Sequence, residues 1–222
     1  MNHIRTYICL LIGLISTNGF AQAYNFQELS IQQGLPQSQA YDILLDSTQH
    51  AWIGTQGGGL CRYDGFEFNY FTKNDSLISN RVYCIEQIND EIWVGQKGGV
   101  SVFDLNANFL RNYKIMNPVS VIQDIIQYKE DVLVATDAGV LYLKDKELVL
   151  YEENVSLYPI NVFSFFNSSE GLWCCTTKGL YHFEDATIKI TNAKGLSAEQ
   201  VNCATTFGYF WVIGTYGGGI DI

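Results

Sequence analysis

Histidines and paired acids are the residues of this chain whose types could support catalysis or metal binding, and their spacing supports neither. His50 falls in an expected turn and His182 on an expected strand, each without a visible partner. No spacing matches a nucleophile elbow or a metal-ligand cluster, and paired acids such as Asp145 and Glu147 are typical of solvated turns. The sequence therefore predicts no catalytic residue, no metal site and no cofactor.

Binding has more support, because polar and aromatic residues recur about forty residues apart in expected turns. In the fold predicted below, two sets of these turns share one face. Loops that vary in chemistry on a repeating scaffold are typical of a binding surface, and polar donors beside an aromatic ring could hold a sugar. The candidate ligand-binding residues are Asn80, Arg81, Lys97, Asp137, Asn161, Lys178, Gln200 and Tyr216.

These turns follow a repeated tract of the type Trp-x-Gly-Thr with glycines after it. Its third position falls at Gly54, Gly95, Ala135, Cys175 and Gly214, in steps of 41, 40, 40 and 39 residues. Self-similarity with this period indicates a repeat architecture. The residues that define the repeat most clearly are Trp52, Gly54, Trp93, Gly95, Trp173 and Gly214.

Each repeat predicts four short antiparallel strands separated by turn residues. In the second repeat these run over Arg81 to Ile88, Glu91 to Gly95, Val100 to Asp104 and Phe109 to Tyr113. The repeats lie near residues 39–72, 80–113, 120–151, 159–191 and 199–222, and the last stops within its third strand. Four strands every forty residues make the blade of a β-propeller, so the predicted fold is all-β.

The tryptophans of the tract have a packing role in this fold. Trp52, Trp93 and Trp173 lie on second strands, where a large ring can fill the wedge between adjacent blades. Trp211 is displaced by one residue in the fifth copy, so we expect its ring to face the other side of the sheet.

The sequence leaves two alternatives for the number of blades. Residues Asn25 to Ile31 alternate like a fourth strand, so a closed ring of five blades is one option. The preferred alternative is that residues 24–222 form the N-terminal part of a longer propeller, with seven blades expected.

Composition restricts the location and partners of the chain. Arg5, the apolar run from Tyr7 to Ile15 and the small residues Ala21 and Ala23 predict a signal peptide over residues 1–23. The formal net charge of −10 argues against nucleic acid, which needs clustered Lys and Arg. Five cysteines follow residue 23 without a Cys-x-x-Cys pair, so small buried strand residues are expected rather than a disulfide framework, although the disulfide state stays open.

Several motifs together resemble the two-component regulator propeller repeat. They are Gly34-Leu35-Pro36, Asp46-Ser47, WIGTQGGGL, Arg62-Tyr63-Asp64-Gly65 with Phe66 and Phe68, and IGTYGGG near the end. The resemblance covers about residues 24–222. It implies a bacterial sensor with a signal peptide and a periplasmic propeller, followed by a membrane helix and a cytoplasmic output part, commonly a histidine kinase.

What the resemblance implies for function is ligand sensing outside the membrane, often of saccharides. The expected partner is a small molecule or oligosaccharide, with membrane attachment only through later segments and a homodimer as an option in the intact sensor. The chain has no phospho-acceptor helix or nucleotide-binding motif, so no kinase activity is expected in these residues. Two alternatives stay open: an exported propeller enzyme acting on polysaccharide, and a protein-binding scaffold.

Overall fold

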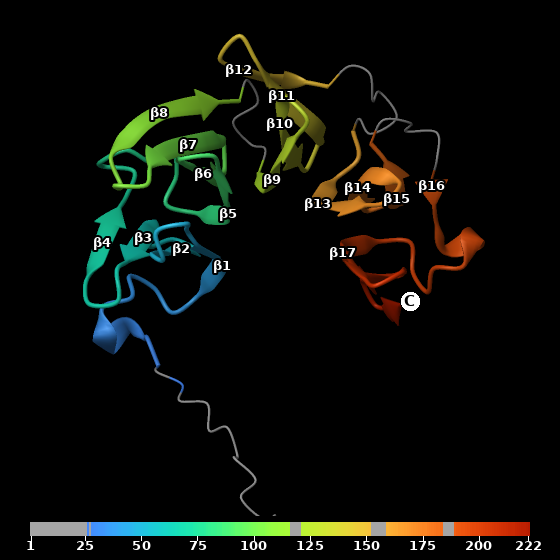
Figure 1. The fold of residues 1–222 in the computed structure, drawn as a ribbon, viewed down its shortest axis with the longest axis horizontal. Helices are drawn as coiled ribbons and strands as arrows, with labels where there is room; N and C mark the ends of the chain where they lie inside the picture. Colours follow the sequence, from blue (N-terminus) through green and yellow to red (C-terminus); the bar gives the residue numbers. More distant parts are fainter. Residues whose placement is uncertain (1–25, 27, 116–120, 152–158, 184–188) are drawn as a thin grey trace, which may run out of the picture.

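The computed structural model describes residues 26, 28–115, 121–151, 159–183 and 189–222, and it places five antiparallel sheets in an open arc (Figure 1). The predicted signal peptide lies outside the described residues. Among the residues that are described, no helix is long and apolar enough to cross a membrane.

Each sheet is a meander whose strands pair in chain order. The first sheet contains β1 (Ala40–Leu45), β2 (Ala51–Thr55), β3 (Leu60–Tyr63) and β4 (Phe68–Phe71). The second contains β5 (Val82–Ile88), β6 (Glu91–Gln96), β7 (Gly99–Asp104) and β8 (Phe109–Lys114). The third contains β9 (Ile122–Tyr128), β10 (Asp131–Thr136), β11 (Gly139–Lys144) and β12 (Glu147–Leu150). The fourth contains β13 (Val162–Ser168), β14 (Gly171–Thr176), β15 (Gly179–His182) and β16 (Lys189–Ile190), and the fifth β17 (Val201–Phe207), β18 (Phe210–Thr215) and β19 (Gly219–Asp221).

The all-β propeller prediction is confirmed, and the strands expected in the second repeat lie within a residue of those observed. The segment expected to form a strand over Asn25 to Ile31 is described at Phe26 and residues 28–31, and none of these is in a strand. No strand precedes β1 among the described residues, and Ile31–Gln33 instead form a short 3-10 helix. Ser30 caps this helix and Gly34 ends it at φ 111°, so local capping overrides the alternating pattern.

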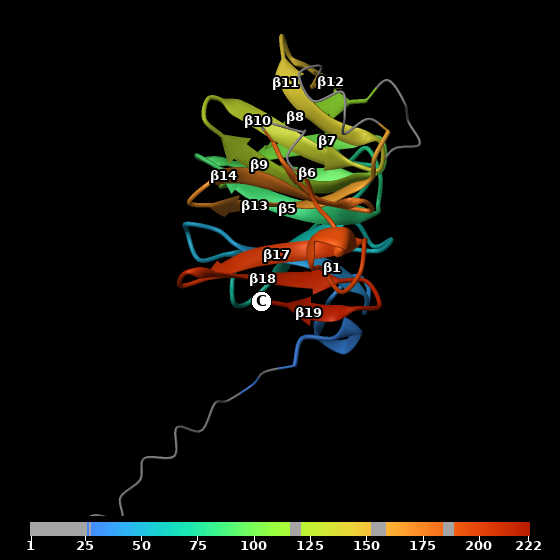
Figure 2. The ribbon, with the colours of Figure 1, turned by 90° about the vertical axis from the view of Figure 1, so that its right-hand side faces the viewer.

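The first strands of the sheets line the inner side of the arc in chain order, and Figure 2 shows the sheets from the side. Each of these strands has a register irregularity near its start, for example between Val82 and Cys84. Five equivalent residues follow it: Asp42, Cys84, Asp124, Ser164 and Cys203. A bulge re-aims the side chain that follows it, and the first four of these side chains reach the neighbouring sheet.

Large rings fill the wedges between sheets, as predicted. Trp52 is fully buried and lies 6.0 Å from the Phe103 ring of the second sheet, measured between centroids. Trp173 packs on Trp211 at 5.1 Å. Trp211 pairs with Thr206, one position away from the register of the other tryptophans, so its ring faces the preceding sheet as expected.

Tract glycines are required where sheets approach closely. A Cβ atom on Gly95 would stand 2.7 Å from Cγ2 of Ile122 in the third sheet, and one on Gly54 would stand 2.5 Å from Cγ1 of Val82. Both distances are too short for carbon atoms. The small residue at this position therefore sets the spacing between neighbouring blades.

The cysteine prediction is correct at four positions and wrong at one. Cys61, Cys84, Cys174 and Cys175 are buried, whereas Cys203 on β17 is exposed. In the part of the chain that the structure describes, no sheet covers that side of β17, which is the physical reason for the difference. All five are free thiols, so no disulfide joins them.

Candidate functional site

The two sets of turns predicted to carry ligand-binding residues lie on one face and are bonded to each other. In the fourth sheet the Thr177 amide donates to the Asn161 carbonyl at 3.1 Å, and in the fifth the Tyr216 amide donates to the Gln200 carbonyl at 2.9 Å. The turn after each second strand is thus held beside the entrance to the first strand. We call this surface the turn face.

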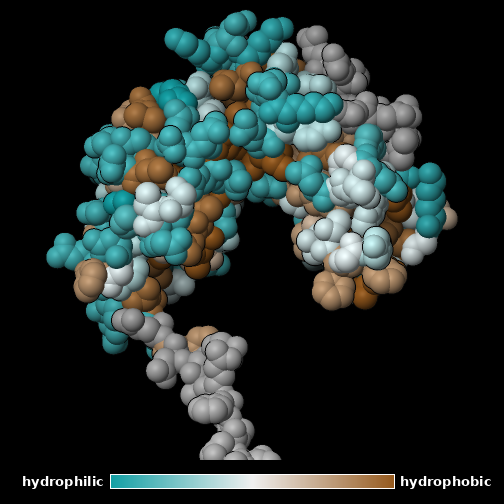
Figure 3. All heavy atoms as spheres, in the orientation of Figure 1, coloured by the Kyte–Doolittle hydropathy of each residue, from teal (hydrophilic) through white to brown (hydrophobic). Residues whose placement is uncertain are grey.

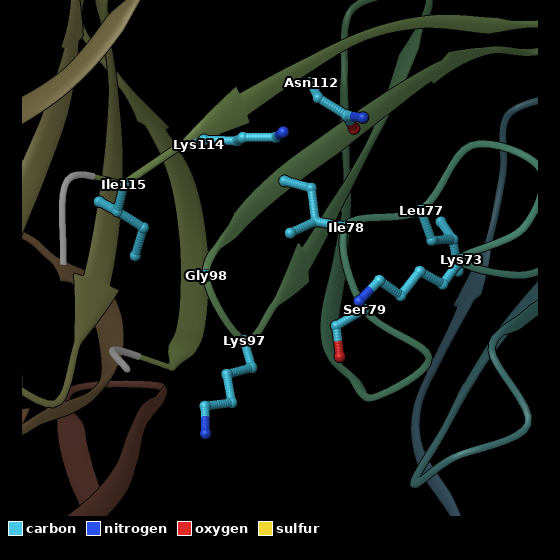
Figure 4. Close-up of a pocket in the computed structure, with 9 residues that line it drawn as sticks. All are labelled: Lys73, Leu77, Ile78, Ser79, Lys97, Gly98, Asn112, Lys114 and Ile115. Carbon is cyan, nitrogen blue, oxygen red and sulfur yellow. The ribbon is translucent and has the colours of Figure 1, made fainter. Parts of the chain in front are cut away.

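A cavity of about 620 Å³ opens over the second sheet on the turn face (Figure 4). Three segments enclose it: the connector from β4 to β5, the turn from β6 to β7, and the end of β8. Its lining residues are Lys73, Leu77, Ile78, Ser79, Lys97, Gly98, Asn112, Lys114 and Ile115.

The cavity forms where the second copy of the tract departs from the others. The first, third, fourth and fifth copies have a threonine that donates to the glycine carbonyl closing the turn, as Thr176 does to Gly179 at 2.7 Å. The second copy has Gln96 instead. Its Oε1 accepts the Ser79 amide at 2.7 Å, and its amide donates to the Ser101 hydroxyl at 3.0 Å. Gln96 therefore ties the β4–β5 connector to the sheet and fixes one wall of the cavity.

Two further contacts hold the connector in place. Leu77 is 4% exposed and packs in the core between the first two sheets. The Asn112 amide donates to the Ser76 carbonyl at 3.1 Å. The cavity walls are therefore anchored to the scaffold at several points, which suits a preformed binding site.

Of the predicted site residues, only Lys97 lines this cavity. Asn80 lies behind its wall, where its side-chain oxygen accepts the Lys73 amide at 2.6 Å, and Arg81 is exposed with its amide on the Ser79 hydroxyl. The others stand elsewhere on the turn face. They are Asp137, Asn161, Lys178, Gln200 and Tyr216, and a binding role for them stays a prediction.

Sequence reasoning missed Lys73, Lys114 and Asn112. Neither lysine belongs to a turn of the tract, since Lys73 is in a connector and Lys114 ends a fourth strand. The one available signal was the Gln96-Lys97 pair, which breaks the tract where threonine is usual.

A second, smaller cavity of about 370 Å³ lies between the fourth and fifth sheets at the opposite face. Tyr209 and Trp211 supply its aromatic surface, beside Asn167 and serine hydroxyls. Tyr209 is fully exposed at the tip of the β17–β18 turn. The sequence singled out Trp211 only for packing.

Acids near the axis act as clamps between blades. The Asp42 carboxylate accepts the Ile85 amide of the next sheet at 2.6 Å, and Asp124 accepts the Phe165 amide at 2.7 Å. Burial raises the pKa of Asp124 to about 6 despite these bonds. Burial, then the charges of Asp124 and Asp42, raises the pKa of Glu86 to about 7. Asp42 and Asp124 accept backbone amides of the next sheet, so both have a structural role.

Asp46 also has a structural role. Its buried carboxylate accepts the Trp52 indole N–H at 2.8 Å, and it accepts the Thr48 hydroxyl and two amides of its turn. Burial opposes ionisation of Asp46, but these hydrogen bonds outweigh it and lower the pKa. The first tryptophan is thus fixed by a polar bond. The indole N–H groups of Trp93 and Trp173 have no such partner among the described residues.

His50 and His182 line neither cavity. His50 Nδ1 lies 2.7 Å from the Thr48 hydroxyl, and His182 Nε2 lies 2.8 Å from the Glu170 carbonyl. Within the described ranges, no group of three or more His, Cys, Asp or Glu side chains could hold a metal ion.

Comparisons with known proteins agree with the fold. No family model and no curated relative matches the sequence. Among solved structures, the extracellular domain of BT3049 from B. thetaiotaomicron, described as a hybrid two component system, superposes with a TM-score of 0.66 at 17% identity, over 84% of this chain and 27% of that one. The extracellular domain of BT4673 from the same organism gives 0.59 at 18%, over 72% and 23%.

A virginiamycin B lyase from Staphylococcus aureus bound to quinupristin gives a TM-score of 0.60 at 14% identity, over 88% of this chain and 72% of that one. The chain spans about a quarter of the length of the two extracellular domains. At these identities the likeness establishes the propeller fold, which sensors and enzymes share.

Proposed function

We propose that this propeller is part of the extracytoplasmic ligand-sensing region of a bacterial two-component signalling protein. The preformed cavity over the second sheet carries this proposal, because variable side chains surround it on a scaffold that otherwise repeats. The likeness to extracellular domains of BT3049 and BT4673 supports it. The expected ligand is a saccharide or another small molecule.

The whole protein would extend beyond these residues. We propose export through residues 1–23, a periplasmic location, a propeller of seven blades, and an inner-membrane anchor leading to a cytoplasmic output part. The exposed apolar side chains of the first and fifth sheets support further blades, since residues such as Ile43 and Phe207 occupy positions that neighbours bury elsewhere in the arc.

Sensing requires that the ligand bind one conformation more tightly than another, since only differential affinity shifts an equilibrium. The β4–β5 connector lies between the first and second sheets and also forms a wall of the cavity. A ligand in the cavity would therefore contact the seam between two blades, where a change in packing can be transmitted.

Thermal unfolding of the full chain against a panel of oligosaccharides tests the proposal. A ligand at one hundred times its Kd should add about 2.7 kcal/mol to the free energy of unfolding and raise the midpoint. A rise with one member and none with its isomers supports sensing. If no member of a broad panel moves the midpoint, saccharide sensing by these residues is contradicted.

A further inference from the structure

Three lysines from separate segments line the cavity over the second sheet. Lys73 comes from the β4–β5 connector, Lys97 from the β6–β7 turn and Lys114 from the end of β8. In Figure 4 the Lys114 amine extends over Ile78 and the Lys73 amine ends beside Ser79, while the Lys97 side chain extends from the tip of its turn and points away from both. Three of the chain's thirteen Lys and Arg residues thus line this one cavity, although the chain has 23 acidic residues.

None of these lysines has an ion-pair partner among the described residues. The fourth sheet offers a comparison, because Lys178 lies in the corresponding turn, one position after the equivalent of Lys97. Its Nζ lies 3.8 Å from the Glu199 carboxylate. An anion bound in the cavity would supply the counter-charge that these lysines lack.

The remaining lining adds apolar contact and neutral hydrogen-bonding groups. Leu77, Ile78 and Ile115 supply aliphatic surface, while Ser79 and Asn112 supply a hydroxyl and an amide. This combination suits a ligand with a carbon skeleton as well as a negative charge. The formal net charge of −10 repels long polyanions approaching from solution, so a small ligand is favoured.

We infer that this cavity binds a small organic anion, a molecule with at least one carboxylate or sulfate group on a carbon skeleton such as a sugar acid. The inference rests on the proposed sensing function and specifies the chemical class of its ligand. Lys73 and Lys114 neutralise the anionic group, Lys97 adds positive charge from its turn, and the aliphatic side chains contact the skeleton.

Titration calorimetry on the full chain tests this inference with three probes: tri-galacturonate, the neutral trisaccharide maltotriose, and inorganic sulfate. The test variant is Lys73→Gln/Lys97→Gln/Lys114→Gln. The control variant, Lys144→Gln/Lys146→Gln/Lys194→Gln, makes the same change in net charge at exposed lysines outside the cavity. All six side chains are exposed, so both variants should fold, which their unfolding midpoints will check.

We expect tri-galacturonate to bind the wild type, to bind the test variant at least tenfold more weakly, and to bind the control within twofold. Higher salt should weaken binding to the wild type. Equal affinity for the test variant, or no detectable binding of tri-galacturonate, would overturn the inference. Maltotriose binding without tri-galacturonate binding would overturn it too, yet leave the proposed function standing. Sulfate binding as tight as that of the trisaccharide acid would overturn the assignment to an organic anion.

Discussion

The second and fifth sheets share one strand order and one bulge position, but they bury equivalent residues to very different degrees. Ile88 at the end of β5 is 6% exposed, whereas its equivalent Phe207 on β17 is 75% exposed. The first sheet shows the same effect on its other side, since Ile43 is 64% exposed and its equivalent Ile85 is 5% exposed. Burial at these positions depends on a neighbouring sheet and not on residue type.

This difference separates two sources of stability in a repeat protein. Each blade contributes its own ladder of hydrogen bonds, and each pair of blades contributes an apolar interface. The second sheet has interfaces on both sides and the fifth has one. Figure 3 shows brown apolar atoms along the inner side of the arc and at the free end of the last sheet.

The largest contrast should come from the reactivity of matched cysteines. Cys84 and Cys203 occupy equivalent positions, one buried against Ile122 and one exposed. Burial also raises the pKa of the Cys84 thiol, which reduces its thiolate form. We expect maleimide to label Cys203 at least a thousandfold faster than Cys84, measured by peptide mass spectrometry. Comparable rates would show that the second sheet opens freely, or that the face bearing Cys203 is covered.

Removing a wedge tryptophan should have the next largest effect. Trp52→Ala leaves a cavity between two sheets and deprives the Asp46 carboxylate of its indole donor, so we expect a loss of about 3–5 kcal/mol in the free energy of unfolding. Trp211→Ala, in the half-buried fifth sheet, should cost less. Urea unfolding of both variants measures the difference, and equal losses would contradict the comparison.

These positions show how far sequence reasoning reached. The forty-residue period indicated the propeller, and the one-residue displacement of Trp211 correctly indicated its reversed ring, because side-chain direction alternates along a strand. The exposure of Cys203 did not follow from the period, since a repeat pattern treats every copy as flanked by others.

The candidate site was less predictable than the fold. Lys97 belongs to a tract turn and was identified, but Lys73 and Lys114 come from a connector and a strand end that carry no repeated signal. Their place at one cavity depends on how the β4–β5 connector folds over the second sheet. That path is set by Gln96 and Leu77, whose contacts are tertiary and leave no periodic trace.

Matched glycines offer a sharper test of the interface than the tryptophans. Gly95→Ala would place its Cβ 2.7 Å from Ile122 of the next sheet and 2.2 Å from the Cys84 sulfur, so we expect a loss of about 1–3 kcal/mol. At the equivalent Gly214→Ala the added Cβ meets only Cys203, its sulfur at 2.9 Å and its carbonyl oxygen at 3.7 Å, and no residue of another sheet. Gly214→Ala should therefore lower the free energy of unfolding, measured with urea, distinctly less than Gly95→Ala does. A greater loss at Gly214 would show that blade spacing is not what this glycine protects.

The smallest expected effect is on the pH dependence of stability. The first strands of the second and third sheets carry the acids Glu86 and Asp124, which have no acidic counterpart in the fifth sheet. The pKa of Glu86 is raised from 4.5 to about 7, so the folded state holds its proton where the unfolded state has lost it. The stability from this group is therefore complete below about pH 4.5 and is lost as the pH rises through 7. Glu86→Gln should make the urea midpoint less dependent on pH between 5 and 8.

The size of that change should stay under about 1 kcal/mol, because the half-buried carboxyl is screened by water. Asp46 provides an internal contrast, since its pKa is lowered and its contribution is lost only as the pH falls through the acid range. The two groups titrate in separate windows, so a midpoint that rises from pH 5 to 8 in the wild type would contradict the role assigned to Glu86. A pH profile unchanged by Glu86→Gln would assign the titration instead to Asp124, whose pKa of about 6 lies in the same window.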